Sequence, residues 1–115
     1  MNSIYQYRNN VHWTNSEKKA ARKAFDQALK CNLQEIIAEA KQKMAKVNEP
    51  SDLWELEAYL TESRKTLNQV YQFRSSRLLT VFSTLMGEGR LTEADLVGLQ
   101  PDKIDRIKRG AEAFR

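Results

Sequence analysis

Apolar residues recur at helical intervals along two long stretches of the chain, with a short polar break between them. In the first stretch they are three or four residues apart, the spacing of one face of an amphipathic helix. These positions are Phe25, Leu29, Leu33, Ile36, Ala40, Met44 and Val47. Thr14 and Glu17 precede the stretch with the spacing of an N-terminal capping box. The pattern predicts a helix from about residue 15 to 47, roughly 50 Å long.

A second long helix is predicted after Asn48-Glu49-Pro50, because proline is tolerated in the first turn of a helix but not in its interior. Its apolar positions, again three or four residues apart, are Leu53, Leu56, Leu60, Leu67, Tyr71, Leu78, Phe82 and Leu85. Two positions of the same register hold arginine instead, Arg64 and Arg74. Gly87 and Gly89 are expected to end this helix after about 35 residues, with Phe73-Arg74-Ser75-Ser76 as a candidate bend.

Shorter elements are predicted at the two ends of the chain. Thr92-Glu93-Ala94-Asp95 is a second N-cap signature, and Pro101-Asp102 opens a last helix that runs to about Phe114. Residues 1–13 show no sustained period. We expect a flexible arm there, or a short irregular segment that Trp13 anchors.

The chain is therefore predicted to be a single all-α domain in three parts. These parts are a flexible N-terminal arm over 1–13, two long helices forming a dimerisation stalk over 14–86, and a head of short helices over 87–115. Two long helices joined by a three-residue turn form an antiparallel hairpin.

A hairpin of this length leaves apolar surface uncovered, because each helix has only one neighbour. Large exposed apolar patches are rare on monomers, and the head is too short to cover the whole hairpin. We therefore predict a homodimer in which two hairpins form an extended helical bundle. The predicted interface residues are Leu33, Ile36, Leu53, Leu56 and Leu60.

Positive charge is concentrated in the first half of the chain. The formal net charge is +4, and residues 1–50 carry nine Lys or Arg against five Asp or Glu, whereas residues 51–115 carry ten of each. The excess lies mainly at Lys18, Lys19, Arg22, Lys23 and Lys30. Because no recognised nucleic-acid motif contains this cluster, a solvated helix face is favoured over a phosphate-binding strip. No nucleic acid is expected as a partner, although a nucleic-acid-binding helical protein remains an alternative.

The residue types needed for catalysis or metal binding are sparse. His12 is the only histidine and Cys31 the only cysteine, which disfavours a His/Cys metal site and a held nucleophile–base pair. No glycine-rich phosphate loop is present. We predict no enzymatic activity, no cofactor and no metal. No apolar run approaches the roughly 20 residues of a membrane span, so we expect no membrane insertion and a cytoplasmic protein.

The start of the second helix is the strongest candidate for a partner-binding surface. Trp54 and Tyr59 lie near its beginning, and Arg64 and Arg74 take positions where the apolar stripe should continue. Aromatic residues and arginine are enriched at the centres of protein interfaces, and the planar guanidinium suits carboxylates and backbone carbonyls. The pattern indicates a helical binding protein rather than an enzyme.

Two segments resemble the fluorescence recovery protein family of cyanobacteria. The first is Asp52-Leu53-Trp54, then Leu56, Tyr59-Leu60 and Arg64, with Tyr71 and Arg74 further on. The second is Glu88-Gly89-Arg90-Leu91-Thr92-Glu93-Ala94-Asp95-Leu96-Val97-Gly98-Leu99. Either segment alone is a weak signal, but together they are more specific, and the match spans roughly residues 14–110.

The resemblance implies an all-helical homodimer without enzymatic activity, with Leu53 matching an interface leucine of the family. Such proteins bind the photoactivated orange carotenoid protein, mainly through its C-terminal domain. They speed its return to the orange form and help to detach it from the phycobilisome, which ends photoprotective quenching. A cytoplasmic protein that reaches the thylakoid through a phycobilisome-bound partner is implied.

The resemblance also implies a functional surface near the dimer centre, to which Trp54 and Arg64 correspond by position. Glu57 and Ala58 belong to the same patch, but the family pattern has histidine and aspartate there. In the head, Thr80 replaces an aromatic residue. Because of these departures, a second interpretation stays open: a diverged helical dimeric adaptor of the same fold with a different protein target.

Overall fold

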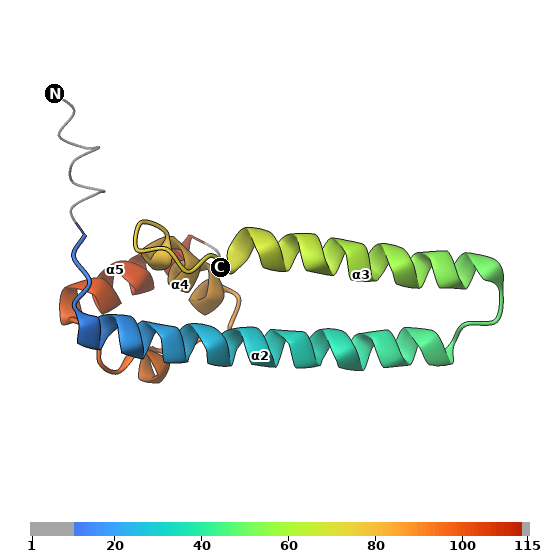
Figure 1. Cartoon of the computed structure of the whole chain (residues 1–115), viewed down its shortest axis with the longest axis horizontal. Coiled ribbons are helices and arrows are strands. Elements are labelled where there is room, and N and C mark those ends of the chain that lie inside the picture. Colours follow the sequence, from blue (N-terminus) through green and yellow to red (C-terminus); the bar gives the residue numbers. More distant parts are fainter. Residues whose placement is uncertain (1–10, 114–115) are drawn as a thin grey trace, which may run out of the picture.

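The structure is a helical hairpin with a compact helical head at one end (Figure 1). It is a computed structural model that describes residues 11–113. Along the chain the elements are α2 (Asn15–Ala45), α3 (Pro50–Val70), α4 (Leu78–Gly87), the 3₁₀-helix η1 (Glu93–Leu96) and α5 (Pro101–Glu112). The described residues contain no strand, and the predicted all-α class is confirmed. The molecule is elongated, with extents of 57 × 33 × 26 Å.

Helix α2 begins and ends close to the predicted positions. The Thr14 hydroxyl accepts from the Glu17 N–H at 3.1 Å, and the Thr14 N–H donates to the Glu17 carboxylate at 3.1 Å. This capping box satisfies two N–H groups that the helix itself cannot pair. Trp13, just before it, is buried in the core with 4% of its surface exposed, as expected if it anchors the segment before the helix. Most of the predicted arm, residues 1–10, lies outside the described residues.

Helix α3 is shorter than predicted. The sequence spacing indicated one helix from the proline to the glycine pair, but α3 ends at Val70 and residues 71–77 are not helical. Helix α4 then begins at Leu78 and packs against α5 rather than continuing the hairpin. The head therefore includes residues 78–87, which the sequence pattern had assigned to the stalk.

Contacts with α2 explain why the helix stops where it does. The Tyr71 hydroxyl donates to the Ala28 carbonyl at 3.4 Å and accepts from the Asn32 amide at 3.2 Å. The ring of Phe25 meets Tyr71 edge-on, with centroids 5.5 Å apart, and Phe73 in the same manner at 5.2 Å. Such contacts stabilise a chain reversal that no glycine or proline marks, so local spacing could not reveal it.

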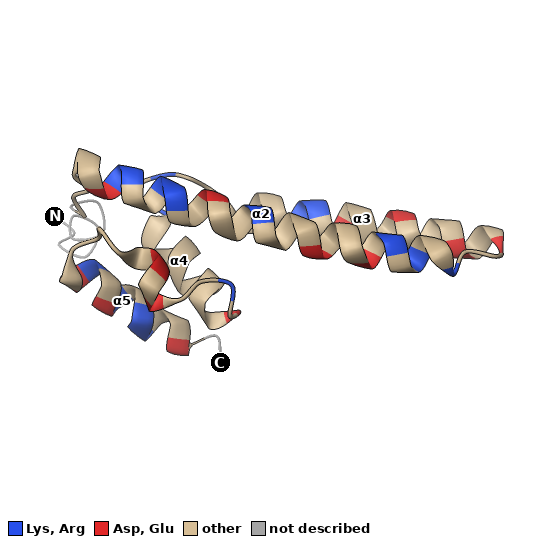
Figure 2. Cartoon of the chain, turned by 90° about the horizontal axis from the view of Figure 1, so that it is seen from below, with Lys and Arg blue, Asp and Glu red and all other residues tan. Residues whose placement is uncertain are grey.

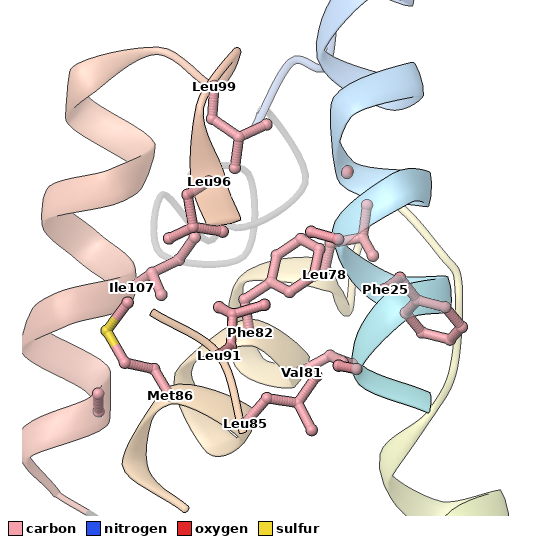
Figure 3. Close-up of a cluster of buried hydrophobic side chains, with 14 of the residues drawn as sticks. Phe25, Leu78, Val81, Phe82, Leu85, Met86, Leu91, Leu96, Leu99 and Ile107 are labelled. Carbon is pink, nitrogen blue, oxygen red and sulfur yellow. The ribbon is translucent and has the colours of Figure 1, made fainter. Parts of the chain in front are cut away.

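The hydrophobic core lies between the first half of α2 and the head (Figure 3). Its members come from the N-terminal segment, α2, α4, the loop around η1, and α5. They are Trp13, Ala21, Ala24, Phe25, Ala28, Leu78, Val81, Phe82, Leu85, Met86, Leu91, Leu96, Leu99, Ile107 and Ala111. Three of the four α2 helix residues in this core are alanine, so the head can approach the α2 backbone closely. The helical head is thus fixed to one end of the hairpin by a well-filled core.

A buried ion pair joins the start of α5 to the start of α2. Glu17 and Lys103 are 2% and 6% exposed, and the Lys103 ammonium lies 2.9 and 3.0 Å from the two carboxylate oxygens. The Gln100 N–H donates to the same carboxylate at 3.0 Å. Burial alone would raise the pKa of Glu17, but these hydrogen bonds, with that from Thr14, lower it to about 2. The ion pair therefore sets where the head sits along α2.

Candidate protein-binding surface

The stalk, defined here as residues 29–70, leaves large apolar side chains in solvent. No residue of this part of the chain is buried. Its exposed large hydrophobic residues are Leu33, Ile37, Met44, Leu53, Trp54 and Leu60. Single exposed apolar residues are normal on a protein surface, whereas large contiguous apolar patches are rare on monomers. The directions of these six side chains therefore decide whether they form such a patch.

Five of the six share one face of the hairpin. At 3.6 residues per turn, Leu33, Ile37 and Met44 point about a quarter turn away from the side of α2 that faces α3. Leu53 and Leu60 point about a quarter turn away from the side of α3 that faces α2. Because the two helices are antiparallel, these two directions coincide. These five residues are called the apolar face below.

The head lies on the opposite side of the hairpin from the apolar face. Ala24, Ala28 and Glu35 point from α2 in the direction opposite to that face. The two alanines are buried in the core with the head, and the Glu35 carboxylate pairs with the Arg90 guanidinium of the loop after α4. Figure 2, seen along the edge of the hairpin, shows the head on one side of it. The described part of the head therefore leaves the apolar face uncovered.

Arg64 continues the apolar face towards the head. It shares a shallow surface groove with three leucines and two polar residues. This groove is lined by Leu53, Leu56, Glu57, Leu60, Thr61 and Arg64. Arg64 is exposed and forms no ion pair with any residue in 11–113. Its guanidinium is therefore available for a carboxylate or carbonyl of a bound protein.

Trp54 lies on the outer edge of the hairpin, next to this groove. It is 63% exposed, and the helical period points its side chain away from α2. Ala58, one turn further along α3, lies on the same outer edge, and Glu57 lies between this edge and the groove. The structure thus places Trp54, Glu57, Ala58 and Arg64 on neighbouring parts of one helix surface.

Tyr59 and Ile36 lie elsewhere. Tyr59 is five residues from Trp54, so the two side chains leave α3 in directions about 140° apart. Its ring faces α2, where the Lys43 ammonium lies 5.1 Å from the ring centroid. Tyr59 and Ile36 both line the cavity between α2 and α3. Within one chain they therefore hold the hairpin together, and their predicted roles in partner binding and dimerisation have no support from their position.

Arg74 does not share a helix with Arg64. The predicted common register required one continuous helix, but Arg74 belongs to the 71–77 linker. Its side chain is exposed, and its carbonyl accepts from the N–H groups of Arg77 and Leu78, which begins the turn into α4. The sequence-based placement of Arg74 on the stripe of α3 is therefore wrong, and Arg74 is an exposed cation of the linker.

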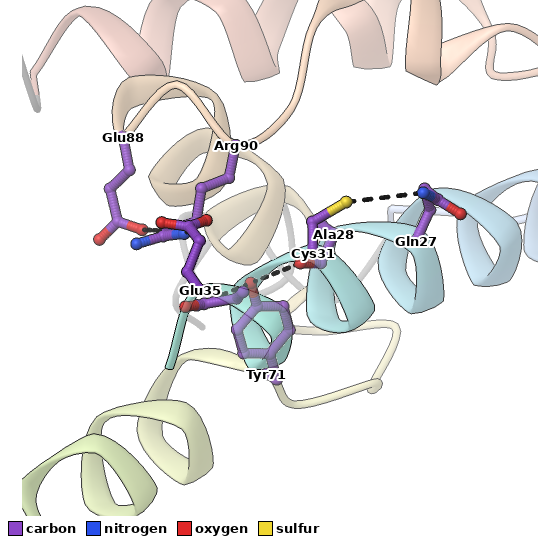
Figure 4. Close-up of polar contacts among 8 residues, drawn as sticks. Gln27, Ala28, Cys31, Glu35, Tyr71, Glu88 and Arg90 are labelled. Carbon is purple, nitrogen blue, oxygen red and sulfur yellow. Dashed lines mark hydrogen bonds and ion pairs between the residues drawn. The ribbon is translucent and has the colours of Figure 1, made fainter. Parts of the chain in front are cut away.

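A polar network that sequence reasoning missed links the head to the stalk (Figure 4). The Arg90 guanidinium pairs with Glu35 of α2 and lies 3.4 Å from the Glu88 carboxylate. Tyr71 lies beside it, and burial raises the pKa of this hydroxyl. The only available signal was Arg90 within the C-terminal motif, and nothing in its spacing indicated a partner 55 residues earlier.

The sparse candidate chemistry is not assembled into a site in the described structure. His12 and Cys31 are both exposed, and the Cys31 sulfur accepts only a long contact from the Gln27 amide at 3.6 Å. Residues 11–113 contain no group of three His, Cys, Asp or Glu that could hold a metal ion. None of the helices in this range is both long and apolar enough to cross a membrane.

Comparison with known proteins identifies the family. The profile of the family described as "Photoprotection regulator fluorescence recovery protein" matches residues 13–111. The chain belongs to the fluorescence recovery protein family. It is 28% identical over 96 residues to the fluorescence recovery protein of Synechocystis sp. (strain ATCC 27184 / PCC 6803 / Kazusa), a match that covers 84% of this chain and 88% of that protein.

Solved structures of fluorescence recovery proteins have the same fold. The protein from Fremyella diplosiphon superposes with a TM-score of 0.84 at 28% identity, and that from Synechocystis sp. PCC 6803 with 0.83 at 28% identity. Each match covers 88% of this chain and 99% of the other. The family assignment supports a role as a photoprotection regulator.

Proposed function

We propose that this chain binds photoactivated orange carotenoid protein through the C-terminal domain of that protein. Binding accelerates the reversion from the red to the orange form and promotes detachment from the phycobilisome, which ends photoprotective energy quenching. The observation that carries the proposal is the uncovered surface of α3, which carries an exposed Trp54 and, further along the same helix, an exposed Arg64 with no ion-pair partner in residues 11–113. The resemblance to the family implies that these two residues correspond to its functional surface.

The mechanism is differential binding. A protein without catalytic groups speeds a conformational relaxation when it binds the arrangement that precedes the product better than the activated one. A long α-helix holds Trp54 and Arg64 at fixed separation, about 15 Å along the axis. The partner therefore gains both contacts only in a geometry that matches this spacing, and that geometry becomes more populated.

The direct test is to mix this chain with photoactivated orange carotenoid protein and follow its absorbance in the dark. We expect the red form to disappear at least about tenfold faster, which corresponds to about 1.4 kcal/mol of selective stabilisation. Recovery at the uncatalysed rate, with the chain folded by circular dichroism, would instead favour the diverged adaptor with another protein target. If the proposal holds, the protein is cytoplasmic and reaches the thylakoid only through its phycobilisome-bound partner.

We further propose that the apolar face is covered by a second copy of the chain. Leu53 and Leu60 are 42% and 43% exposed, and Leu33 is 41% exposed. They lie on the side of the hairpin that the head does not cover, so a twofold axis can bring two such faces together. Trp54, on the outer edge, would then lie at the rim of the dimer and stay accessible to the partner.

Replacing Leu60 by Glu is expected to dissociate the dimer without unfolding the chain. A charge at this position would be buried against apolar side chains of the second copy, which costs several kcal/mol when unpaired. In the single chain Leu60 is exposed, so the helix itself tolerates the change. Sedimentation should show a monomer with unchanged helicity, whereas Gln69→Glu on the polar side should stay dimeric. A monomeric wild type would contradict the proposed dimer.

A further inference from the structure

A row of lysines lies on α2 near the head, between the direction of the apolar face and the outer edge of the helix. Lys19, Lys23 and Lys30 project from α2 within about 40° of one another, over about 17 Å of helix. All three are exposed. Figure 2 shows blue segments along this half of α2. Lys19 precedes Ile37 by five full turns and therefore points in the direction of the apolar face, closer to the head. This basic row thus borders the apolar face, on the other helix from Trp54 and Arg64.

The carboxylates of α2 do not neutralise the basic row. Each of them is already engaged by another cation. The pairs are Glu17 with Lys103, Asp26 with Arg22, Glu35 with Arg90 and Glu39 with Lys43. The three lysines of the basic row have no ion-pair partner within the described range 11–113. The row is therefore an uncompensated positive strip on an otherwise balanced molecule.

The neighbours of the row limit its width. Arg22 could have widened it, but its guanidinium lies 4.7 Å from the centre of the Phe73 ring and is paired with Asp26. On the other side the nearest positions hold Gln27 and Gln34, which carry no charge. The row is one lysine wide.

A strip of this width fits a protein better than a nucleic acid. Proteins that hold duplex DNA by charge commonly engage about six to ten phosphates. That is more than the row can neutralise even if Lys41 is added, which is exposed and points in the same direction further along α2. A short row of opposite charge on a protein surface, by contrast, is enough to steer encounter and fix orientation. The row therefore suits a protein edge that carries several carboxylates.

We propose that the basic row is a second docking strip, which receives an acidic edge of the same protein that binds at Trp54 and Arg64. This inference rests on the proposed function and adds to it the charge of the partner and the orientation in which it binds. Contacts with Trp54 and Arg64 on α3 and with the row on α2 would fix the orientation of the partner on the rigid hairpin. The strip would act mainly on the rate of association, because exposed charges contribute little to the bound state.

The test removes the three charges together. We expect Lys19→Gln/Lys23→Gln/Lys30→Gln to lower the association rate constant with photoactivated orange carotenoid protein about tenfold at low ionic strength. The dependence of that rate on salt should become shallower, because screening then has fewer charges to act on. Stopped-flow mixing over a range of salt concentrations measures both quantities.

The control removes the same total charge elsewhere. Lys46→Gln/Lys65→Gln/Lys108→Gln lowers the net charge equally and should change the rate less than about twofold. An equal loss in both variants would overturn the docking strip and leave only a net-charge effect. Salt-dependent binding of duplex DNA by the wild type, lost in the row variant, would also overturn it in favour of a nucleic-acid strip. A wild type that does not bind the carotenoid protein would overturn the proposed function itself.

Discussion

Replacing Arg64 by Leu is expected to leave the protein folded while reducing its acceleration of the red-to-orange reversion by about tenfold to a hundredfold. A hydrogen bond to a charged group contributes about 1.5–3 kcal/mol, which accounts for that range. Arg64 forms no ion pair with a described residue and is exposed, so its loss removes nothing that holds the hairpin. The measurement is dark recovery of the carotenoid protein, with circular dichroism and sedimentation as checks of the fold.

Two further variants separate shape from charge at this position. Arg64→Lys keeps the charge but loses the planar fork, so it should recover only part of the activity if the contact is bidentate. Lys65→Leu removes the adjacent cation and should behave as wild type. Within residues 11–113 its only ion-pair partner is Glu62, 3.6 Å away on an exposed surface. Equal activity of Arg64→Leu and wild type would remove Arg64 from the partner-binding surface.

The parts of the fold that sequence could predict are those fixed by local chemistry. The capping box at Thr14 set the start of α2, and Pro50 set the start of α3. Of the leucines spaced along α3, Leu53 and Leu60 lie on an exposed side, whereas Leu56 and Leu67 are half-buried and line cavities shared with α2. Helical periodicity depends only on position along one element. For this reason Trp54 and Arg64 could be placed on neighbouring parts of the surface.

The parts that sequence could not predict depend on contacts between distant segments. The register from Leu53 to Leu85 is compatible with one helix, and only the packing of Tyr71 and Phe73 on Phe25 shows that it breaks. Arg74 was misplaced as a consequence. Tyr59 was grouped with Trp54 by closeness in sequence, although the helical period separates them in space. These errors arise because the spacing of residues along one segment does not show which contacts that segment makes with the rest of the fold.

The sequence also gave no sign that Glu17 has two roles. Its spacing from Thr14 predicted the capping box, which the structure contains. The second role, as partner of Lys103, joins residues 86 positions apart, and a lysine in the last helix reads as a surface charge. The buried ion pair between Glu17 and Lys103 is therefore the polar contact of the head that sequence predicts least and that stability depends on most.

Replacing Glu17 by Gln is expected to destabilise the protein by about 3–5 kcal/mol. The change leaves the Lys103 ammonium buried without its counter-charge, and breaking one partner of a buried pair costs about that much. Chemical denaturation of wild type and variant measures the difference. Glu93→Gln removes an exposed partner of Lys108, 2.9 Å away, and should cost less than about 1 kcal/mol. A similar small cost for both variants would show that the buried pair does not fix the head.

The same pair predicts how stability depends on pH. The pKa of Glu17 falls from its ordinary value of 4.5 to about 2 in the folded protein. A carboxyl group with a lowered folded pKa stabilises the fold above its unfolded pKa and loses that contribution as the pH falls through the folded one. The wild type should therefore lose about 3 kcal/mol between about pH 5 and pH 2 through this group. Glu17→Gln should show a flatter profile over that range, because it has no proton to bind at this position.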